Sequence, residues 1–177
     1  MDALRQEEID LGFVRMPVTD PRLECLPVLH ERLVAAVGPR SAWRRRAGLG
    51  SLSEQPFVVC ARAISASYYD HVVALCRAAG FTPRIVAETN ERFSLLQLVR
   101  AGVGAALVPS AAASMRVPGV GFKDVRRAQA AWDIALAWRS QTDRGPLVAE
   151  FVRIAGQVYE RRSALGRASG RGSSRPD

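Results

Sequence analysis

Two consecutive strand–helix units between residues 57 and 110 constrain the fold of this chain most strongly. The runs FVVC and RIVAET are of strand length, and each precedes an amphipathic helical segment. Gly80 and Gly102 follow these segments, at the left-handed position where glycine commonly ends a helix. Strand–helix units in succession indicate parallel strands joined by helical crossovers. The chain is therefore predicted to be an α/β protein.

Small polar residues occupy the turns that follow the two strands. Ser65 and Ser67 come after the first strand, and Thr89 and Asn90 come after the second. Ligands of parallel sheets lie beyond the carboxyl ends of the strands, against helix N-termini. Hydroxyl and amide groups suit helix capping and the binding of a small polar ligand equally well. Both roles therefore stay open, and the pattern favours binding over chemistry.

Further strands are expected on either side of these units. The segment Ile9–Arg15 (IDLGFVR) alternates apolar and other residues as a strand does, with Ile9, Leu11 and Phe13 on one side. The other expected strands are Val28–Val37, Ala105–Val108, Val120–Val125 and Asp133–Trp138. Residues 3–8 are expected to be the end of a helix, and the three prolines of residues 16–27 predict a loop or a sheet edge.

Helical spacing gives specific expectations about which side chains are buried. Asn90 is predicted to be the N-cap of the second helix. Pro146 is well placed as the first residue of a final helix. The predicted buried stripes are, in chain order, Tyr69, Val72, Val73 and Cys76; Phe93, Leu95, Leu96, Leu98 and Val99; and Leu147, Phe151, Ile154, Ala155 and Val158.

Composition excludes several classes of protein. The 177 residues suffice for one domain or two small lobes. No apolar run approaches the roughly 20 residues that span a bilayer, and the charged N-terminus is unlike a signal peptide. The three cysteines have neither metal-type nor redox-type spacing, and Cys60 and Cys76 are interpreted as small core residues. A reducing cytoplasm is the expected location.

The net charge of +8 does not predict a DNA-binding surface. The last 17 residues hold five arginines against one aspartate, in a segment rich in Gly and Ser that is expected to be disordered. Arg44–Arg46 forms a second small cluster in an expected surface loop. A DNA-binding face concentrates basic residues on one helix or stripe, and the remaining charges are scattered.

Catalytic and metal-binding motifs are missing from the sequence. His30 and His71 stand at no ligand spacing, and no serine occupies a G-x-S-x-G elbow. Asp70 and Glu88 are single carboxylates without an acid–base partner in the pattern. The segment 102–104 (GVG) follows a helix and precedes a strand, so it is interpreted as a helix end with close backbone packing. We expect no enzyme activity, metal or cofactor.

Several segments, in their order along the chain, resemble a known family. IDLGFVR, YDHVVALCRAAGFTPRIVAET, LVRAGVGAALVPS and IALAWR resemble the effector-binding domain of LysR-type transcriptional regulators. The likeness covers roughly residues 2–160. It implies two α/β lobes of the periplasmic-binding-protein type II kind, with a small-molecule effector in the cleft between them. It also implies a homo-oligomer that binds DNA through an N-terminal winged helix-turn-helix.

The resemblance divides the chain into lobes and suggests that one is incomplete. The first lobe is expected to comprise residues 1–37 and 133–165, and the second residues 38–132, with residues 166–177 as the disordered tail. No segment resembles the helix-turn-helix. The first strand, first helix and second strand of the family's ligand domain also have no counterpart, so the first lobe is expected to lack part of its sheet. DNA binding is therefore expected only through a helix-turn-helix that this chain lacks.

The resemblance also carries over candidates for the effector site. Arg15 ends the first strand and either pairs with a carboxylate effector in bidentate fashion or faces solvent. The turn Ser65, Ala66 and Ser67 offers backbone N–H groups and a helix dipole that favour an anion. Thr89 and Asn90 occupy the equivalent turn, and Pro109 closes the cleft side of its strand. The expected effector is an organic acid.

Two alternatives to a regulator share the expected fold. A free-standing solute-binding protein would require an export signal, which the N-terminus does not resemble. An enzyme would require a nucleophile, a metal cluster or an acid–base pair, and the motifs of this chain provide none. The regulator domain is therefore the preferred hypothesis.

Overall fold

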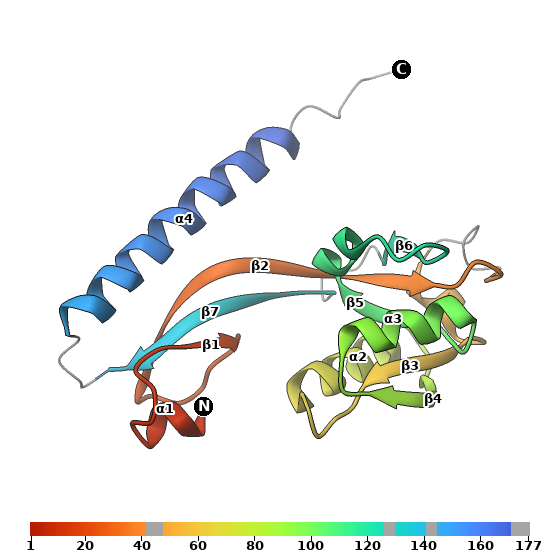
Figure 1. Cartoon of the computed structure of the whole chain (residues 1–177), viewed down its shortest axis with the longest axis horizontal. Coiled ribbons are helices and arrows are strands. Elements are labelled where there is room, and N and C mark those ends of the chain that lie inside the picture. The colour runs from red at the N-terminus through yellow and green to blue at the C-terminus, as the bar shows by residue number, and fades with distance from the viewer. Residues whose placement is uncertain (42–47, 126–129, 141–144, 171–177) are drawn as a thin grey trace. The chain divides into compact units, whose positions relative to one another are not determined.

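A computed structural model describes residues 1–41, 48–125, 130–140 and 145–170 of the chain. They form two compact units (Figure 1). Unit 1 comprises Met1–His30 and Trp132–Asp177, and unit 2 comprises Glu31–Ala131. Helices and strands occur in both units, as an α/β fold requires. The arginine cluster at 44–46 and the end of the tail, residues 171–177, lie outside the described residues.

The described part of unit 1 is built on three strands. Its elements are α1 (Asp2–Arg5), β1 (Gly12–Arg15), the first half of β2 (Leu23–Val37), β7 (Ala131–Arg139) and α4 (Pro146–Gly170). Strand β1 pairs antiparallel with β7, with Gly12 opposite Ala137 and Arg15 opposite Ile134, and β2 lies on the other side of β7. Because β1 has a single neighbour in this sheet, its outer edge is unpaired within the described residues.

Strand β1 is shorter than the predicted segment Ile9–Arg15. The chain turns at Glu7, which has a positive φ of 63°. The Arg139 guanidinium then donates hydrogen bonds to the carbonyl oxygens of Leu4 (2.8 Å) and Ile9 (3.0 Å). These bonds hold the backbone at Ile9 outside the strand, which begins only at Gly12.

Strand β2 is longer than predicted, because it begins within the segment expected to be a loop or a sheet edge. It begins at Leu23, and Leu23 and Cys25 pack in a cluster with Leu4 and Ala137. Burial of these apolar side chains outweighs the local preference of the prolines for a loop. The loop alternative therefore fails for residues 23–27, which are strand, whereas the alternative of a sheet edge is not contradicted.

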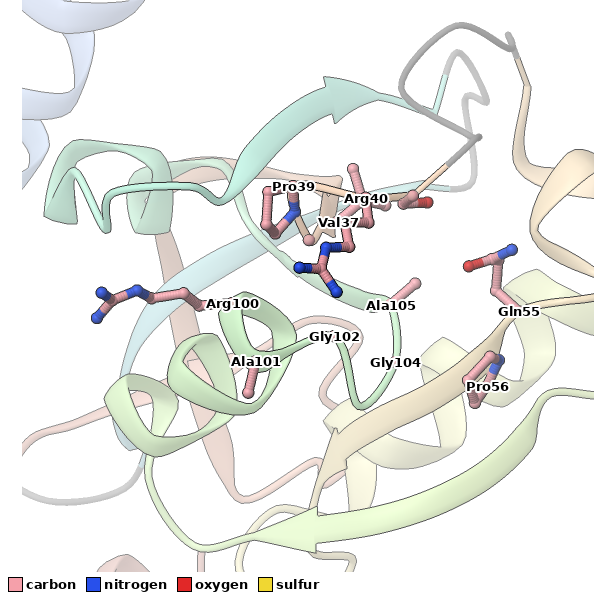
Figure 2. Close-up of a pocket in the computed structure, with 12 residues that line it drawn as sticks. Val37, Pro39, Arg40, Gln55, Pro56, Arg100, Ala101, Gly102, Gly104 and Ala105 are labelled. Atoms are coloured by element: carbon pink, nitrogen blue, oxygen red, sulfur yellow. The ribbon is translucent and has the colours of Figure 1, made fainter.

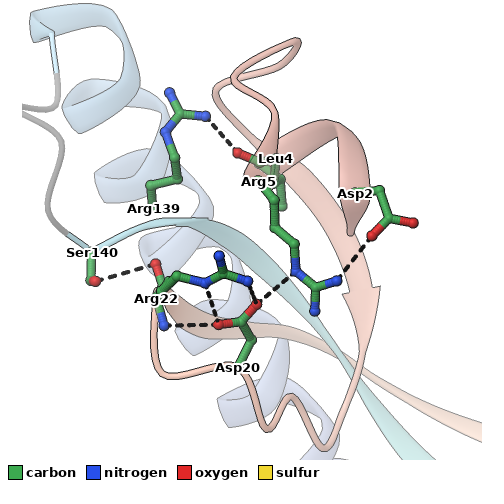
Figure 3. Close-up of polar contacts among 7 residues, drawn as sticks. All are labelled: Asp2, Leu4, Arg5, Asp20, Arg22, Arg139 and Ser140. Atoms are coloured by element: carbon green, nitrogen blue, oxygen red, sulfur yellow. Dashed lines mark hydrogen bonds and ion pairs between the residues drawn. The ribbon is translucent and has the colours of Figure 1, made fainter.

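Asp20, whose side chain is only 6% exposed, connects the start of unit 1 to β2 (Figure 3). Asp20 accepts hydrogen bonds from Arg5 Nε at 2.7 Å and from Arg22 Nε and Nη2 at 3.1 Å each. The backbone N–H of Arg22 donates a further bond at 3.0 Å. The side-chain hydrogen bond from Arg22, followed by its backbone N–H and Arg5, holds the pKa of Asp20 well below its usual range.

Unit 1 should lose stability in acid because of this carboxylate. A lowered pKa in the folded state stabilises the fold above the ordinary aspartate value, and this stabilisation falls away as pH drops below about 4. In thermal unfolding, Asp20→Asn should be less stable than the parent chain at pH 7, and the difference should shrink below about pH 4. Asp2→Asn is the control, because the Asp2 side chain is exposed and also pairs with Arg5. A difference that stays constant from pH 7 to pH 3 would contradict this role for Asp20.

Unit 2 contains the two predicted strand–helix units. Its strands and α-helices, after the second half of β2, are β3 (Pro56–Cys60), α2 (Ala66–Ala78), β4 (Arg84–Thr89), α3 (Arg92–Ala101), β5 (Ala106–Pro109) and β6 (Gly121–Asp124). The described residues of unit 2 also include two short 3₁₀ helices, Leu49–Leu52 and Ser110–Met115. Strand β3 runs parallel to β4, and Phe57 forms a parallel bridge to Ala105. The predicted parallel crossovers are therefore confirmed. Strand β2 pairs antiparallel with both β5 and β6.

The two helices of unit 2 end where the sequence predicts. Gly80 and Gly102 have positive φ angles of 91° and 84°, as the C-terminal glycines of helices commonly do. The buried face of α2 is Tyr68, Val72, Leu75 and Cys76, so the predicted stripe is rotated toward Tyr68. Burial raises the pKa of the Cys76 thiol to about 12, which agrees with its interpretation as a core residue.

The final helix begins at Pro146 as predicted, but most of its predicted buried stripe is exposed. The exposed fractions of the four large side chains lie between 47% and 85%; we call Leu147, Phe151, Ile154 and Val158 the α4 stripe. The helix approaches β2 at Gly156, where an added Cβ would lie 3.5 Å from a side-chain carbon of Leu26. Helical spacing identifies an apolar face correctly, but burial requires a partner surface. Helix α4 extends to Gly170, into the segment expected to be disordered.

Candidate functional site

The turn Ser65–Ser67 lies between the carboxyl end of β3 and the first turn of α2. Ser65 is the N-cap residue, and its carbonyl accepts the first helical hydrogen bond from the N–H of Tyr69 at 3.0 Å. Ala66 and Ser67 are exposed in the first helical turn. The first N–H groups of a helix have no intrahelical acceptor, so this turn presents donors and a positive dipole end toward solvent.

The second turn leaves the same edge of the parallel strands. Cys60 pairs with Thr89, and the N–H of Ala61 donates to the Thr89 carbonyl at 2.8 Å. The prediction that Asn90 caps the second helix was wrong, because the N-cap is Glu91 and α3 begins at Arg92. The Thr89 hydroxyl donates to the Glu91 carbonyl at 3.0 Å and stabilises this later start.

Pro109 belongs to the same edge. It is the last residue of β5, which is linked in parallel to β3 through the bridge of Phe57 and Ala105. The carboxyl ends of parallel strands meet at one edge of a sheet. The structure thus brings together, at one edge of unit 2, Ser65, Ala66, Ser67, Thr89, Asn90 and Pro109.

Two apolar side chains flank this edge and were not identified as site residues from the sequence. Ile64 directly precedes the first turn and is 56% exposed, and Phe93 lies in the first turn of α3 and is 55% exposed. Helical periodicity assigned Phe93 to the buried stripe. Leu95 and Leu96, which follow it in the helix, are the buried residues. The position of Phe93 next to a turn at the carboxyl edge was the sequence signal that it could contact a ligand.

Arg15 belongs to unit 1, so its relation to the edge of unit 2 stays a prediction. It ends β1 opposite Ile134, and its guanidinium carbon lies 5.0 Å from the centroid of the Trp132 ring. A guanidinium over an indole ring is held by a cation–π interaction. Arg15 is therefore a half-buried, oriented cation, which differs from a strand end that merely faces solvent.

The chemistry available at this edge is binding chemistry. Among the described residues, no group of three or more His, Cys, Asp and Glu side chains is placed to hold a metal ion. Asp70, near the first turn, is paired with Arg62 at 2.9 Å, and this hydrogen bond lowers the pKa of the carboxyl group. No helix in the described part of the chain is long and apolar enough to cross a membrane. The edge offers hydroxyl groups, backbone N–H groups and two apolar side chains.

Comparison with solved structures identifies the fold. The effector binding domain of a BenM variant aligns with a TM-score of 0.81 and 23% identity, over 92% of this chain and 76% of that one. The BenM effector binding domain with its effector benzoate aligns with a TM-score of 0.79, 23% identity and coverage of 92% and 74%. The chain therefore has the type II periplasmic-binding-like fold of these domains.

Sequence comparison identifies the family. The family described as LysR substrate binding domain matches residues 1–160. The HTH-type transcriptional regulator TfdS of Cupriavidus pinatubonensis (strain JMP 134 / LMG 1197) is 31% identical over 157 residues, which cover 88% of this chain and 53% of that protein. The chain thus spans about half the length of this relative. Both results agree with the order of motifs along the chain, and the protein belongs to the LysR substrate-binding domain family.

Proposed function

We propose that this chain is the effector-binding part of a LysR-type transcriptional regulator and that it binds a small carboxylate at the carboxyl edge of β3 and β4. The observation that carries the proposal is the Ser65–Ser67 turn. It places the N-terminus of α2, a helix of 13 residues, beside the Thr89–Asn90 turn. Backbone N–H groups and the helix dipole at such a position favour an anion.

The flanking side chains support an acid with an apolar body. Ile64 and Phe93 expose apolar surface beside the two turns, and exposed apolar groups next to oriented donors are typical of small-molecule sites. BenM, which shares this fold, is described with benzoate as its effector. An aromatic or branched carboxylate therefore matches both the donors of the two turns and the apolar side chains beside them. Arg15 is proposed to pair with its acid group.

Regulation of transcription requires a DNA-binding segment, and the motifs of this chain do not resemble one. TfdS is described as an HTH-type regulator, and the matched region covers 53% of it. We propose that the motifs found in this chain do not contact DNA. DNA binding by the regulator requires a helix-turn-helix segment in addition to them. As part of such a regulator, it would act in the cytoplasm as a homo-oligomer and without enzymatic activity.

Calorimetry with carboxylate probes tests the site. A thermal-shift screen of small aromatic and aliphatic carboxylates, beginning with benzoate, selects the probe for titration of the 177-residue chain. Each of Ser67→Ala and Arg15→Ala should remove a charge-assisted contact worth about 1.5–3 kcal/mol, which raises Kd roughly 10- to 150-fold. Ser53→Ala is the matched control, because Ser53 is exposed and lies outside the edge. Unchanged affinity in both site variants would refute the assignment of these residues.

A further inference from the structure

Unit 2 contains a pocket at the opposite end of β3 from the Ser65–Ser67 turn. The pocket has a volume of about 400 Å³. Its walls come from the end of β2 with the following residues 38–41, from Gln55 and Pro56 at the start of β3, and from residues 100–105 after α3 (Figure 2). Ser65 follows the carboxyl end of β3, whereas Pro56 is its first residue, so the two sites share no residue.

Close backbone contacts fix the shape of this pocket. A Cβ atom at Gly38 would lie 2.6 Å from the Val99 carbonyl oxygen, and one at Gly104 would lie 2.6 Å from the Pro56 carbonyl oxygen. Both glycines line the pocket, and each permits two backbone segments to touch. Walls made of packed backbone do not collapse as side chains can, so the pocket is largely pre-formed.

The charge of the lining is positive. Among the described lining residues, Arg40 and Arg100 carry the charged side chains, and the neutral polar groups are Ser41 and Gln55. Figure 2 shows the Arg40 guanidinium directed into the space above the Gly102–Ala105 connection, whereas the Arg100 guanidinium extends away from it. Within the described residues Arg40 makes no ion pair. An unneutralised guanidinium at a concave surface is a suitable partner for an acid group.

A simpler role for Arg40 is to complement the end of α3. Helix C-termini carry a partial negative charge, and a nearby cation stabilises them by about 0.3–1 kcal/mol. That role requires neither a cavity nor the polar groups of Ser41 and Gln55. It predicts that loss of the charge changes stability alone, whereas a binding role predicts a change in ligand affinity.

We propose that this pocket binds a compact, polar organic acid, of which a dicarboxylate is the simplest type. Its volume lies within the range of roughly 300–1,000 Å³ that is usual for small-molecule sites. Arg40 takes one acid group, Gln55 and Ser41 add neutral hydrogen bonds, and Arg100, whose guanidinium is directed outward, adds only longer-range positive charge at the rim. Among the described residues that line the pocket none is aromatic, which favours a smaller and more polar ligand than the edge flanked by Phe93.

Hydrogen exchange on the dilute 177-residue chain tests this proposal with succinate as the probe. Succinate should give saturable protection in peptides that cover residues 37–41 and 100–105, and its neutral analogue succinamide should not. Arg40→Gln should raise the Kd for succinate at least tenfold. Arg77→Gln, which removes an exposed arginine from the last turn of α2, should leave it unchanged.

Three results would overturn the proposal. The first is that succinate gives no saturable protection when the ionic strength of every sample is matched with salt. The second is equal protection by succinamide, or protection confined to the Ser65–Ser67 turn. The third is unchanged affinity in Arg40→Gln together with a lower unfolding temperature, which would assign Arg40 to the end of α3 alone.

Discussion

Replacement of Phe151 by glutamate is expected to shift the chain from self-associated species to a monomer of 19.3 kDa. The α4 stripe presents four large apolar side chains along one helix face. Ile9 and Leu11 lie beside it and form, with Leu147, Val148 and Phe151, an open groove of about 460 Å³. Burying a side chain such as Leu or Phe contributes about 1.5–3 kcal/mol, so pairing of two such faces favours association at micromolar concentrations.

Strand β1 adds to this tendency. Its outer edge has no neighbouring strand among the described residues, and Phe13 on it is 66% exposed. An exposed apolar edge strand promotes pairing with other chains. Hydrogen exchange should accordingly be fast for the amides of Gly12–Arg15 and slow for those of β3 and β5.

Sedimentation velocity measures the association directly. Gln157→Glu is the matched control, because it introduces the same charge on the same helix outside the α4 stripe. The control should sediment like the parent chain, and Phe151→Glu should not. A parent chain that is a monodisperse monomer, with equal amide protection in β1, β3 and β5, would show that this surface does not drive association.

Phe57→Ala should destabilise the chain more than any surface substitution. Phe57 is fully buried in β3, and its ring packs against that of Phe81 with the centroids 5.9 Å apart. Removal of a buried phenylalanine costs about 3–5 kcal/mol through lost burial and the cavity that remains. Single domains are stable by only about 5–15 kcal/mol, so the loss is a large share of the total.

Urea denaturation should show the effect as a lower midpoint for unit 2. Phe93→Ala is the matched control, since it removes the same atoms from a side chain that is more than half exposed. Its free energy of unfolding should change by less than about 1 kcal/mol. Equal losses of unfolding free energy in the two variants would mean that Phe57 does not stabilise the core as its burial indicates.

The parts of the fold that were predicted correctly depend on local signals. Gly80 and Gly102 end their helices because the left-handed conformation is intrinsic to a glycine after a helix. The short runs that became β3 and β4 are bounded by turns, and parallel pairing follows from the helices between them. These features require no knowledge of distant residues.

The errors arose where distant contacts decide the structure. Arg139, which is 130 residues from Ile9 in the sequence, delays the start of β1 through its bond to the Ile9 carbonyl. The α4 stripe was identified by periodicity, but whether it is buried depends on the surface opposite it. Leu23 joined β2 because it packs against Leu4 and Ala137. A single sequence does not reveal which of several possible partners a side chain meets.

The candidate edge was predictable only in part, because some of its features depend on local signals and others on distant contacts. Ser65 and Thr89 follow strands, and the topology of parallel strands places such turns together. The exposure of Ile64 and Phe93 could not be read from apolar character alone. The pocket around Arg40 combines three segments that are separated by up to 60 residues, so the sequence offered no indication of it.

The two backbone contacts at Gly38 and Gly104 affect how sequence conservation in this family should be interpreted. At both positions a single methyl group would press into a carbonyl oxygen that belongs to another segment. Natural selection would therefore retain glycine there for steric reasons, whatever ligand the domain recognises. Invariant glycine at positions 38 and 104 would therefore indicate a requirement of the fold of unit 2. Variation at position 40, between family members that respond to different effectors, would indicate differences in the ligand that is bound.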